Sequence, residues 1–218
     1  FTSGNLGSAL ADDDQLLTAC VTDGTAHFLI ATKKGKCIRF DEQQVRPMGR
    51  GTNGVKAIEL DEDDVVVGMA NTEPERSQVL TVCERGYGKR TSLEEFREQN
   101  RGGKGIILID ASERNGPVVG LALVTPADEV VLITDRGQTI RTSVAEIRET
   151  GRVAQGVKVM RIDEGERVVA MEAVGETGDA ADEENGSRTA SGRPAAEDQG
   201  SIPPPESTPD PGPTEDGG

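Results

Sequence analysis

Three similar segments recur along the chain: TKKGKCIRF (residues 32–40), CERGYGKRT (83–91) and TDRGQTIRT (134–142). Their central glycines, Gly35, Gly86 and Gly137, are 51 residues apart. Each segment follows an apolar run, such as Val130–Ile133, and places a turn glycine before a second run, a pattern typical of a β-hairpin. A fixed period of this length predicts a protein built from stacked, equivalent units.

Further positions keep the same interval, and they are Arg39, Arg90 and Arg141; Val45, Phe96 and Ile147; Arg50, Arg101 and Arg152; and Gly54, Gly105 and Gly156. Two more β-rich runs follow the last glycine of a repeat, as in 55–60 and 65–70. Four strands per repeat predict an all-β, propeller-like fold of four-stranded blades. About three and a half blades are expected, because residues 4–10 resemble the end of an earlier copy. Residues 92–97 and 143–148 predict only a short turn capped by serine.

Composition divides the chain into two parts. The net charge is −15, of which 11 acidic and two basic residues after Val174 contribute −9. We therefore assign residues 1–174 to the β domain and 175–218 to an acidic tail, rich in Pro and Gly, that is expected to be disordered. Three cysteines without a CxxC pair indicate reduced core thiols rather than a zinc site or a disulfide.

No catalytic constellation is visible, and we predict no catalytic or metal-binding residue. His27 is the single histidine and lies in a strand-like run without a nucleophile nearby. Tyr87 is the single tyrosine, but its repeat equivalents are Lys36 and Gln138, which indicates a structural position. The loop 99–105, QNRGGKG, lacks the spacing of a nucleotide-binding loop, although its free amides and cations suit a phosphate.

Repeated cations give the strongest functional indication. Equivalent residues occupy equivalent places on successive units, so two arginine rows are expected to form a curved basic track for the phosphates of bent duplex DNA. The predicted DNA-binding residues are Lys33, Lys34, Lys36, Arg39, Arg50, Lys89, Arg90, Arg101, Lys104, Arg141 and Arg152. The alternative is that these arginines join one blade to the next through salt bridges. The shortage of aromatic residues argues against single-strand or RNA binding.

Several segments in the right order resemble the carboxy-terminal domains of the DNA gyrase A family: VRPMGR (45–50), GYGKRT (86–91), ERNGPVVG (113–120) and ITDRG (133–137). The resemblance covers about residues 1–174. It implies a six-bladed β-pinwheel whose basic rim wraps DNA to support negative supercoiling, with an acidic tail that modulates wrapping. The family's box, QRRGGKG, belongs to its first blade, whereas the similar loop 99–105 carries Asn100 and lies in the next-to-last blade.

The resemblance implies a piece of a bacterial, cytoplasmic and nucleoid-associated type II topoisomerase, without the catalytic tyrosine region. Expected partners are duplex DNA, the rest of the gyrase A polypeptide and the gyrase B polypeptide in an A2B2 assembly, with no membrane. No cofactor is expected in this chain, since ATP and Mg2+ would be used by other domains. Two alternatives remain open: the related domain of the topoisomerase IV A polypeptide, and a propeller that binds proteins.

Overall fold

The computed structural model describes residues 14–175, which form an all-β fold of three repeats. The prediction of an all-β, propeller-like array of blades is confirmed. Two other predictions, the end of an earlier copy near residues 4–10 and the disordered acidic tail, concern residues 1–13 and 176–218 and lie outside the described residues. No helix in the described part is long and apolar enough to cross a membrane.

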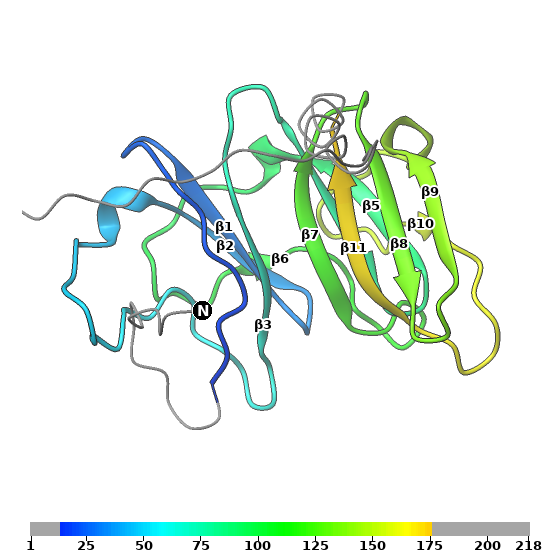
Figure 1. Ribbon diagram of the computed structural model, residues 1–218, viewed down its shortest axis with the longest axis horizontal. Helices are drawn as coiled ribbons and strands as arrows, with labels where there is room; N and C mark the ends of the chain where they lie inside the picture. Colours follow the sequence, from blue (N-terminus) through cyan, green and yellow to red (C-terminus); the bar gives the residue numbers. More distant parts are fainter. Residues whose placement is uncertain (1–13, 176–218) are drawn as a thin grey trace, which may run out of the picture. The chain divides into compact units, whose positions relative to one another are not determined.

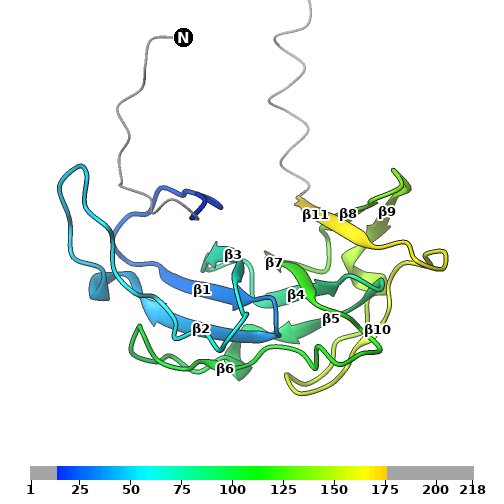
Figure 2. The same ribbon diagram turned by 90° about the horizontal axis from the view of Figure 1, so that it is seen from below.

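Each repeat begins with the predicted hairpin (Figure 1 and Figure 2). The repeated glycine lies in the turn of each hairpin. These hairpins are β1 (His27–Thr32) with β2 (Lys36–Asp41), β4 (Gln78–Cys83) with β5 (Tyr87–Ser92), and β8 (Glu129–Thr134) with β9 (Thr139–Ser143). The turn glycines have φ angles of +84°, +75° and +83°. Glycine is favoured there because a Cβ atom makes this left-handed region costly.

A third strand from the same repeat pairs with the other edge of each hairpin. These strands are β3 (Val66–Asn71) on β1, β7 (Val118–Val124) on β4, and β11 (Val168–Val174) on β8. A register shift interrupts each of the three pairings near one end. Strands β3 and β11 both lie against β7, so the third strands of successive repeats are neighbours.

The fourth strand corrects the prediction that each repeat builds its own complete blade. β6 (Ile106–Ile107) belongs to the second repeat but pairs with β2 of the first, and β10 (Val157–Lys158) of the third repeat pairs with β5 of the second (Figure 2). The predicted strand in residues 55–60 is not formed, because no preceding hairpin is described for it to join. Within residues 14–175, the sheet of the third repeat has three strands, and no further strand pairs with β9.

Short 3-10 helices follow the hairpins and confirm the serine-capped turns. They are η1 (Glu42–Gln44), η2 (Leu93–Glu95) and η3 (Val144–Glu146). The Ser92 hydroxyl accepts a hydrogen bond from the amide of Glu94, and Ser143 accepts one from Ala145. Each helix ends at the repeated apolar position, and Phe96 and Ile147 are thereby directed into the core, where they are 0% and 3% exposed.

The core lies between successive sheets rather than within one. Leu29 and Ala31 of β1 pack with Val79 of β4 and with Phe96, while Leu80 and Val82 face the opposite way, toward Leu132 of the third repeat. The middle sheet is therefore buried on both faces, which explains the nearly continuous apolar runs of β4 and β7. A repeat cannot bury these surfaces alone, so neighbouring repeats stabilise one another.

Candidate nucleic-acid interface

Arg39 and Arg90, of the first predicted row, reach into the repeat that follows. The Arg39 guanidinium donates hydrogen bonds to the carbonyls of Leu93 and Phe96, at 3.4 and 3.3 Å. In the next repeat, Arg90 donates to Ile147 O at 2.5 Å and to Ala145 O at 3.2 Å. Both arginines thus hold the backbone of the following 3-10 turn, and their acceptors are carbonyls rather than the carboxylates of the predicted alternative.

Arg90 is only 9% exposed, and its third contact, from Nη1 to Gln78 Oε1 at 2.9 Å, is with its own hairpin. Its assignment to an outer basic track is therefore corrected. Arg141, the third member of the row, meets no following repeat among residues 14–175. It is exposed and pairs instead with Glu129 of its own hairpin, with Nε at 2.6 Å from the carboxylate.

The second predicted row points back toward the preceding repeat. Arg101 donates to Gln44 O at 2.8 Å and to Lys56 O at 3.1 Å. Arg152 repeats part of this contact, with its Nη1 2.7 Å from Ile107 O. Arg50 has no preceding repeat among the described residues and is exposed. Arg101 and Arg152 therefore act first as links between repeats, with part of each side chain reaching solvent.

Lys89 is fully buried, which corrects its assignment to the DNA-binding surface. Its ammonium group donates to Gly151 O at 2.7 Å and to Arg152 O, both in the next repeat. Burial lowers the pKa of this lysine to about 8. A phosphate oxygen could reach the amine only if the loop at 151–152 moved away, so the residue fixes that loop.

The predicted lysines of the first hairpin lie beside an acidic turn. Lys36 pairs with Asp61 at 2.6 Å, and this hydrogen bond lowers the pKa of the carboxyl group. Lys34 donates to the carbonyl of Glu62, and Arg136 repeats this contact by donating to Glu164 O at 3.2 Å. Lys33 is exposed at the same tip. These cations are present at the surface, but acidic residues at the same tips offset their charge.

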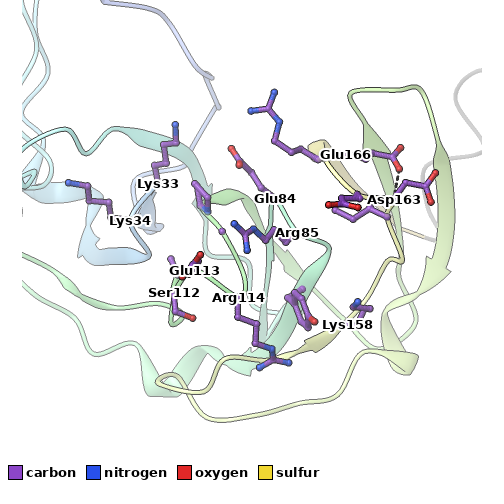
Figure 3. A pocket seen from close by; sticks show the side chains of 18 of the residues that line it. Lys33, Lys34, Glu84, Arg85, Ser112, Glu113, Arg114, Lys158, Asp163 and Glu166 are labelled. Carbon is purple, nitrogen blue, oxygen red and sulfur yellow. Dashed lines mark hydrogen bonds between the residues drawn. The ribbon is translucent and has the colours of Figure 1, made fainter.

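A hollow next to these hairpin tips has the same mixed character. Its lining includes six cations and six carboxylates, among them Glu84, Glu113 and Asp163, which lie between the basic side chains (Figure 3). Tyr87 faces this hollow with the Arg114 guanidinium 4.3 Å and the Lys158 ammonium 5.1 Å from its ring centre. The mixed lining gives the hollow little net attraction for a polyanion. The cation–π contacts give Tyr87 a structural role, as the sequence predicts.

Another cation row was missed by reasoning from the sequence. Arg46, Arg97 and Arg148 keep the 51-residue interval, and all three are exposed. Within residues 14–175, none of their side chains makes a hydrogen bond or an ion pair. They lie just after the 3-10 turns, on loops that also carry Lys104, which is exposed. The interval was a usable signal, but a periodic sequence does not show which repeated cation faces solvent.

Together these features define an all-β repeat protein in which buried and partly buried arginines join the blades and exposed arginines recur once per blade. The family of the DNA gyrase C-terminal domain, beta-propeller, matches residues 26–73, 77–125 and 128–174. The chain belongs to this family. The three matched ranges correspond to the three structural repeats.

Curated relatives place the match within the gyrase A polypeptide. The chain is 41% identical over 179 residues to the DNA gyrase A protein of Staphylococcus epidermidis, covering 81% of this chain and 20% of that protein. It is 42% identical over 187 residues to the gyrase A protein of Staphylococcus aureus strain MRSA252, covering 84% and 20%. For Haloquadratum walsbyi the identity is 38% over 186 residues, covering 85% and 22%. The chain thus spans about a fifth of the length of these relatives.

Solved structures support the same fold. A DNA gyrase A C-terminal domain superposes with a TM-score of 0.71 at 28% identity, covering 78% of this chain and 57% of that one. The C-terminal domain of a DNA topoisomerase IV superposes with a TM-score of 0.73 at 26% identity, covering 78% and 53%. The backbone therefore resembles both topoisomerase domains closely, whereas the curated relatives quoted above are gyrase proteins.

Proposed function

We propose that this chain binds and wraps duplex DNA without sequence preference, as the wrapping part of a cytoplasmic, ATP-dependent DNA gyrase. The observation that carries the proposal is a row of exposed arginines, Arg46, Arg97 and Arg148, on a member of the gyrase C-terminal family. Strand passage, ATP hydrolysis with Mg2+ and assembly with the gyrase B polypeptide would belong to other parts of the enzyme.

The geometry favours this row over the hairpin tips as the DNA track. Equivalent residues on stacked repeats lie at equivalent positions, so one arginine per repeat meets the phosphate backbone at regular intervals. Because these guanidinium groups have no protein partner among the described residues, binding a phosphate breaks no existing ion pair. At the hairpin tips a phosphate must instead compete with the Asp61 carboxylate for Lys36, and with the backbone carbonyls of Glu62 and Glu164 for Lys34 and Arg136.

Phosphate contacts of this kind give affinity without reading bases, as wrapping requires. Each neutralised phosphate releases bound counterions, so the affinity falls steeply as salt is added. The exposed Lys104 and the partly exposed Arg101 and Arg152 lie on the same loops and extend the track. Bent DNA allows contacts on successive repeats to form together.

The test is duplex binding by the 218-residue chain over a range of salt concentrations. Replacing Arg46, Arg97 and Arg148 together with Ala is expected to lower the slope of log affinity against log salt by up to about 2.7, or about 0.9 per lost phosphate contact. The matched control replaces Lys34, Arg85 and Arg136 with Ala, which removes the same charge from the hairpin tips. It is expected to change the slope much less.

Equal slopes for both triple variants would show that only overall charge matters, and they would reject the arginine row as the track. Binding that is absent or insensitive to salt in the unmodified chain would reject DNA wrapping and favour a protein-binding propeller. Wrapping itself is tested by the sign of supercoils trapped when the chain binds nicked circular DNA that is then ligated. An unchanged linking number would show that the chain binds DNA without wrapping it.

A further inference from the structure

We propose that His27, Asp41 and Glu98 form a Zn2+ site that links the first repeat to the second. One possible ligand atom from each residue lies within 4.8 Å of the other two. The closest pair is His27 Nε2 and Glu98 Oε2, at 3.2 Å. His27 and Asp41 belong to the first repeat and Glu98 belongs to the second, so a bound metal bridges the interface.

The backbone holds all three residues in place. His27 begins β1 and pairs directly with Asp41, which ends β2. Glu98 is fixed beside β2 by a bridge to Arg39, and the neighbouring amide of Gln99 donates to Arg39 O at 2.8 Å. Only side-chain rotations are therefore needed to bring the three ligand atoms to the spacing of a tetrahedral metal.

The ligands also suit the metal chemically. An imidazole nitrogen with two carboxylate oxygens is a donor set that Zn2+ accepts, with water completing four-coordination. Ca2+ and Mg2+ prefer more oxygen donors and no imidazole. One Asp41 oxygen accepts a hydrogen bond from the amide of Gln43 at 2.7 Å, which orients the carboxylate while leaving its second oxygen for the metal. The His27 and Glu98 side chains are 26% and 52% exposed, so an ion can enter.

The second interface provides an internal comparison, because it has the same geometry but keeps only one of the three ligand types, the carboxylate of Glu149. Gln78 pairs with Ser92 across the hairpin, and Glu149 bridges to Arg90. There the Gln78 amide donates to Glu149 at 2.7 Å. A neutral amide thus suffices to join two repeats at this position. The first interface instead carries a histidine and an added carboxylate, which place two negative charges around one imidazole and favour a cation.

His27 is the chain's single histidine, so its imidazole signals in an NMR spectrum report on the site directly. We expect one equivalent of Zn2+ to shift the Nε2 resonance of a chain with 15N-labelled histidine. Replacing Cys20 with Ser in every sample removes an exposed thiol, a competing type of zinc ligand. Asp41→Ser and Glu98→Gln are each expected to weaken the Zn2+ affinity measured at His27 by more than ~10-fold.

The double variant His27→Gln/Asp41→Ser gives the first interface the residues of the second, so it is expected to fold. Its thermal midpoint should no longer rise when Zn2+ is added, whereas that of the Cys20→Ser parent should rise because the metal binds the folded state. Unchanged His27 signals with Zn2+ would overturn the assignment. So would equal affinity in the Asp41→Ser variant, or an equal rise of the midpoint in the double variant.

Discussion

The interfaces between repeats differ sharply from the two ends of the array, although the same residues recur at both. Arg39 and Arg90 hold the following repeat, whereas Arg141 meets no further repeat in the described part of the chain and pairs with Glu129 on the surface. Gly105 lies against the carbonyl of Cys37, whereas Gly54 has open space around it. These residues therefore link repeats only where a neighbouring repeat meets them.

The largest loss of stability is expected from a glycine substitution. Two glycines with similar positive φ angles, one crowded and one not, separate the effect of steric crowding from that of backbone strain. Gly105 and Gly54 have φ angles of +70° and +74°, but only at Gly105 would a Cβ meet an atom, Cys37 O, at 2.4 Å. Gly105→Ala is expected to lower the free energy of unfolding by about 3–4 kcal/mol, and Gly54→Ala by about 1 kcal/mol. Urea unfolding measures both. Equal losses would mean that this close approach does not constrain the interface.

The next effect concerns the arginine row. Arg90→Met leaves the carbonyls of Ile147 and Ala145 without their donor in a buried interface, at a cost of about 2–3 kcal/mol. Arg141→Met removes only an exposed ion pair and is expected to cost less than about 1 kcal/mol. Thermal and urea unfolding of the two variants provide the comparison. A similar cost at both positions would contradict the role of Arg90 as a link between repeats.

A smaller effect is expected from Lys89, whose pKa is lowered by burial to about 8. Between about pH 8 and 10.5 the unfolded chain binds more protons at this residue than the folded chain does, so stability rises with pH in this window. Relative to Lys89→Met, the rise should be on the order of 1–2 kcal/mol. Unfolding at several pH values measures it. A difference that is flat across the window would show that the amine titrates normally.

The smallest expected effect concerns the reactivity of the three thiols. Labelling compares the reactivity of Cys20, in the exposed segment before β1, with that of the two thiols buried at the first interface. Burial raises the pKa values of Cys37 and Cys83 to about 12, whereas Cys20 is exposed. At about pH 8 we expect a thiol reagent to modify Cys20 rapidly in the folded chain and the other two only after unfolding. Mass spectrometry of the labelled peptides identifies the sites. Rapid modification of Cys37 would indicate that the interface opens readily.

The repeat interval made much of the fold predictable from the sequence. Gly35, Gly86 and Gly137 correctly located the three hairpins, and Val45, Phe96 and Ile147 marked residues that pack into successive cores. The pairing of β6 and β10 with the hairpins of the preceding repeats was not predictable from the sequence. A two-residue strand such as Ile106–Ile107 has too little periodicity to indicate its partner. Pairing with the preceding hairpin depends on tertiary contacts.

The candidate interface was predicted less well, for a physical reason. Arginines spaced 51 residues apart are expected both for a surface track and for a series of links between blades. Only the structure shows which role applies, through the hydrogen bonds that Arg90 and Arg101 make to neighbouring repeats. Arg97 shares the interval but extends into solvent. The direction of a side chain relative to the next repeat is set by the packing of the sheets, which the spacing of residues does not record.

The strand that completes a blade lies in the following 51-residue unit of the sequence, after that unit's own hairpin. The repeat of the sequence and the blade of the structure therefore begin and end at different residues. Swapping one 51-residue unit between two homologous proteins would transplant a hairpin together with the edge strand of a different blade. Chimeras that exchange only the short segment holding Ile106–Ile107 or Val157–Lys158 would change the edge strand and leave its recipient hairpin unchanged. Such exchanges therefore test edge compatibility alone, one blade at a time.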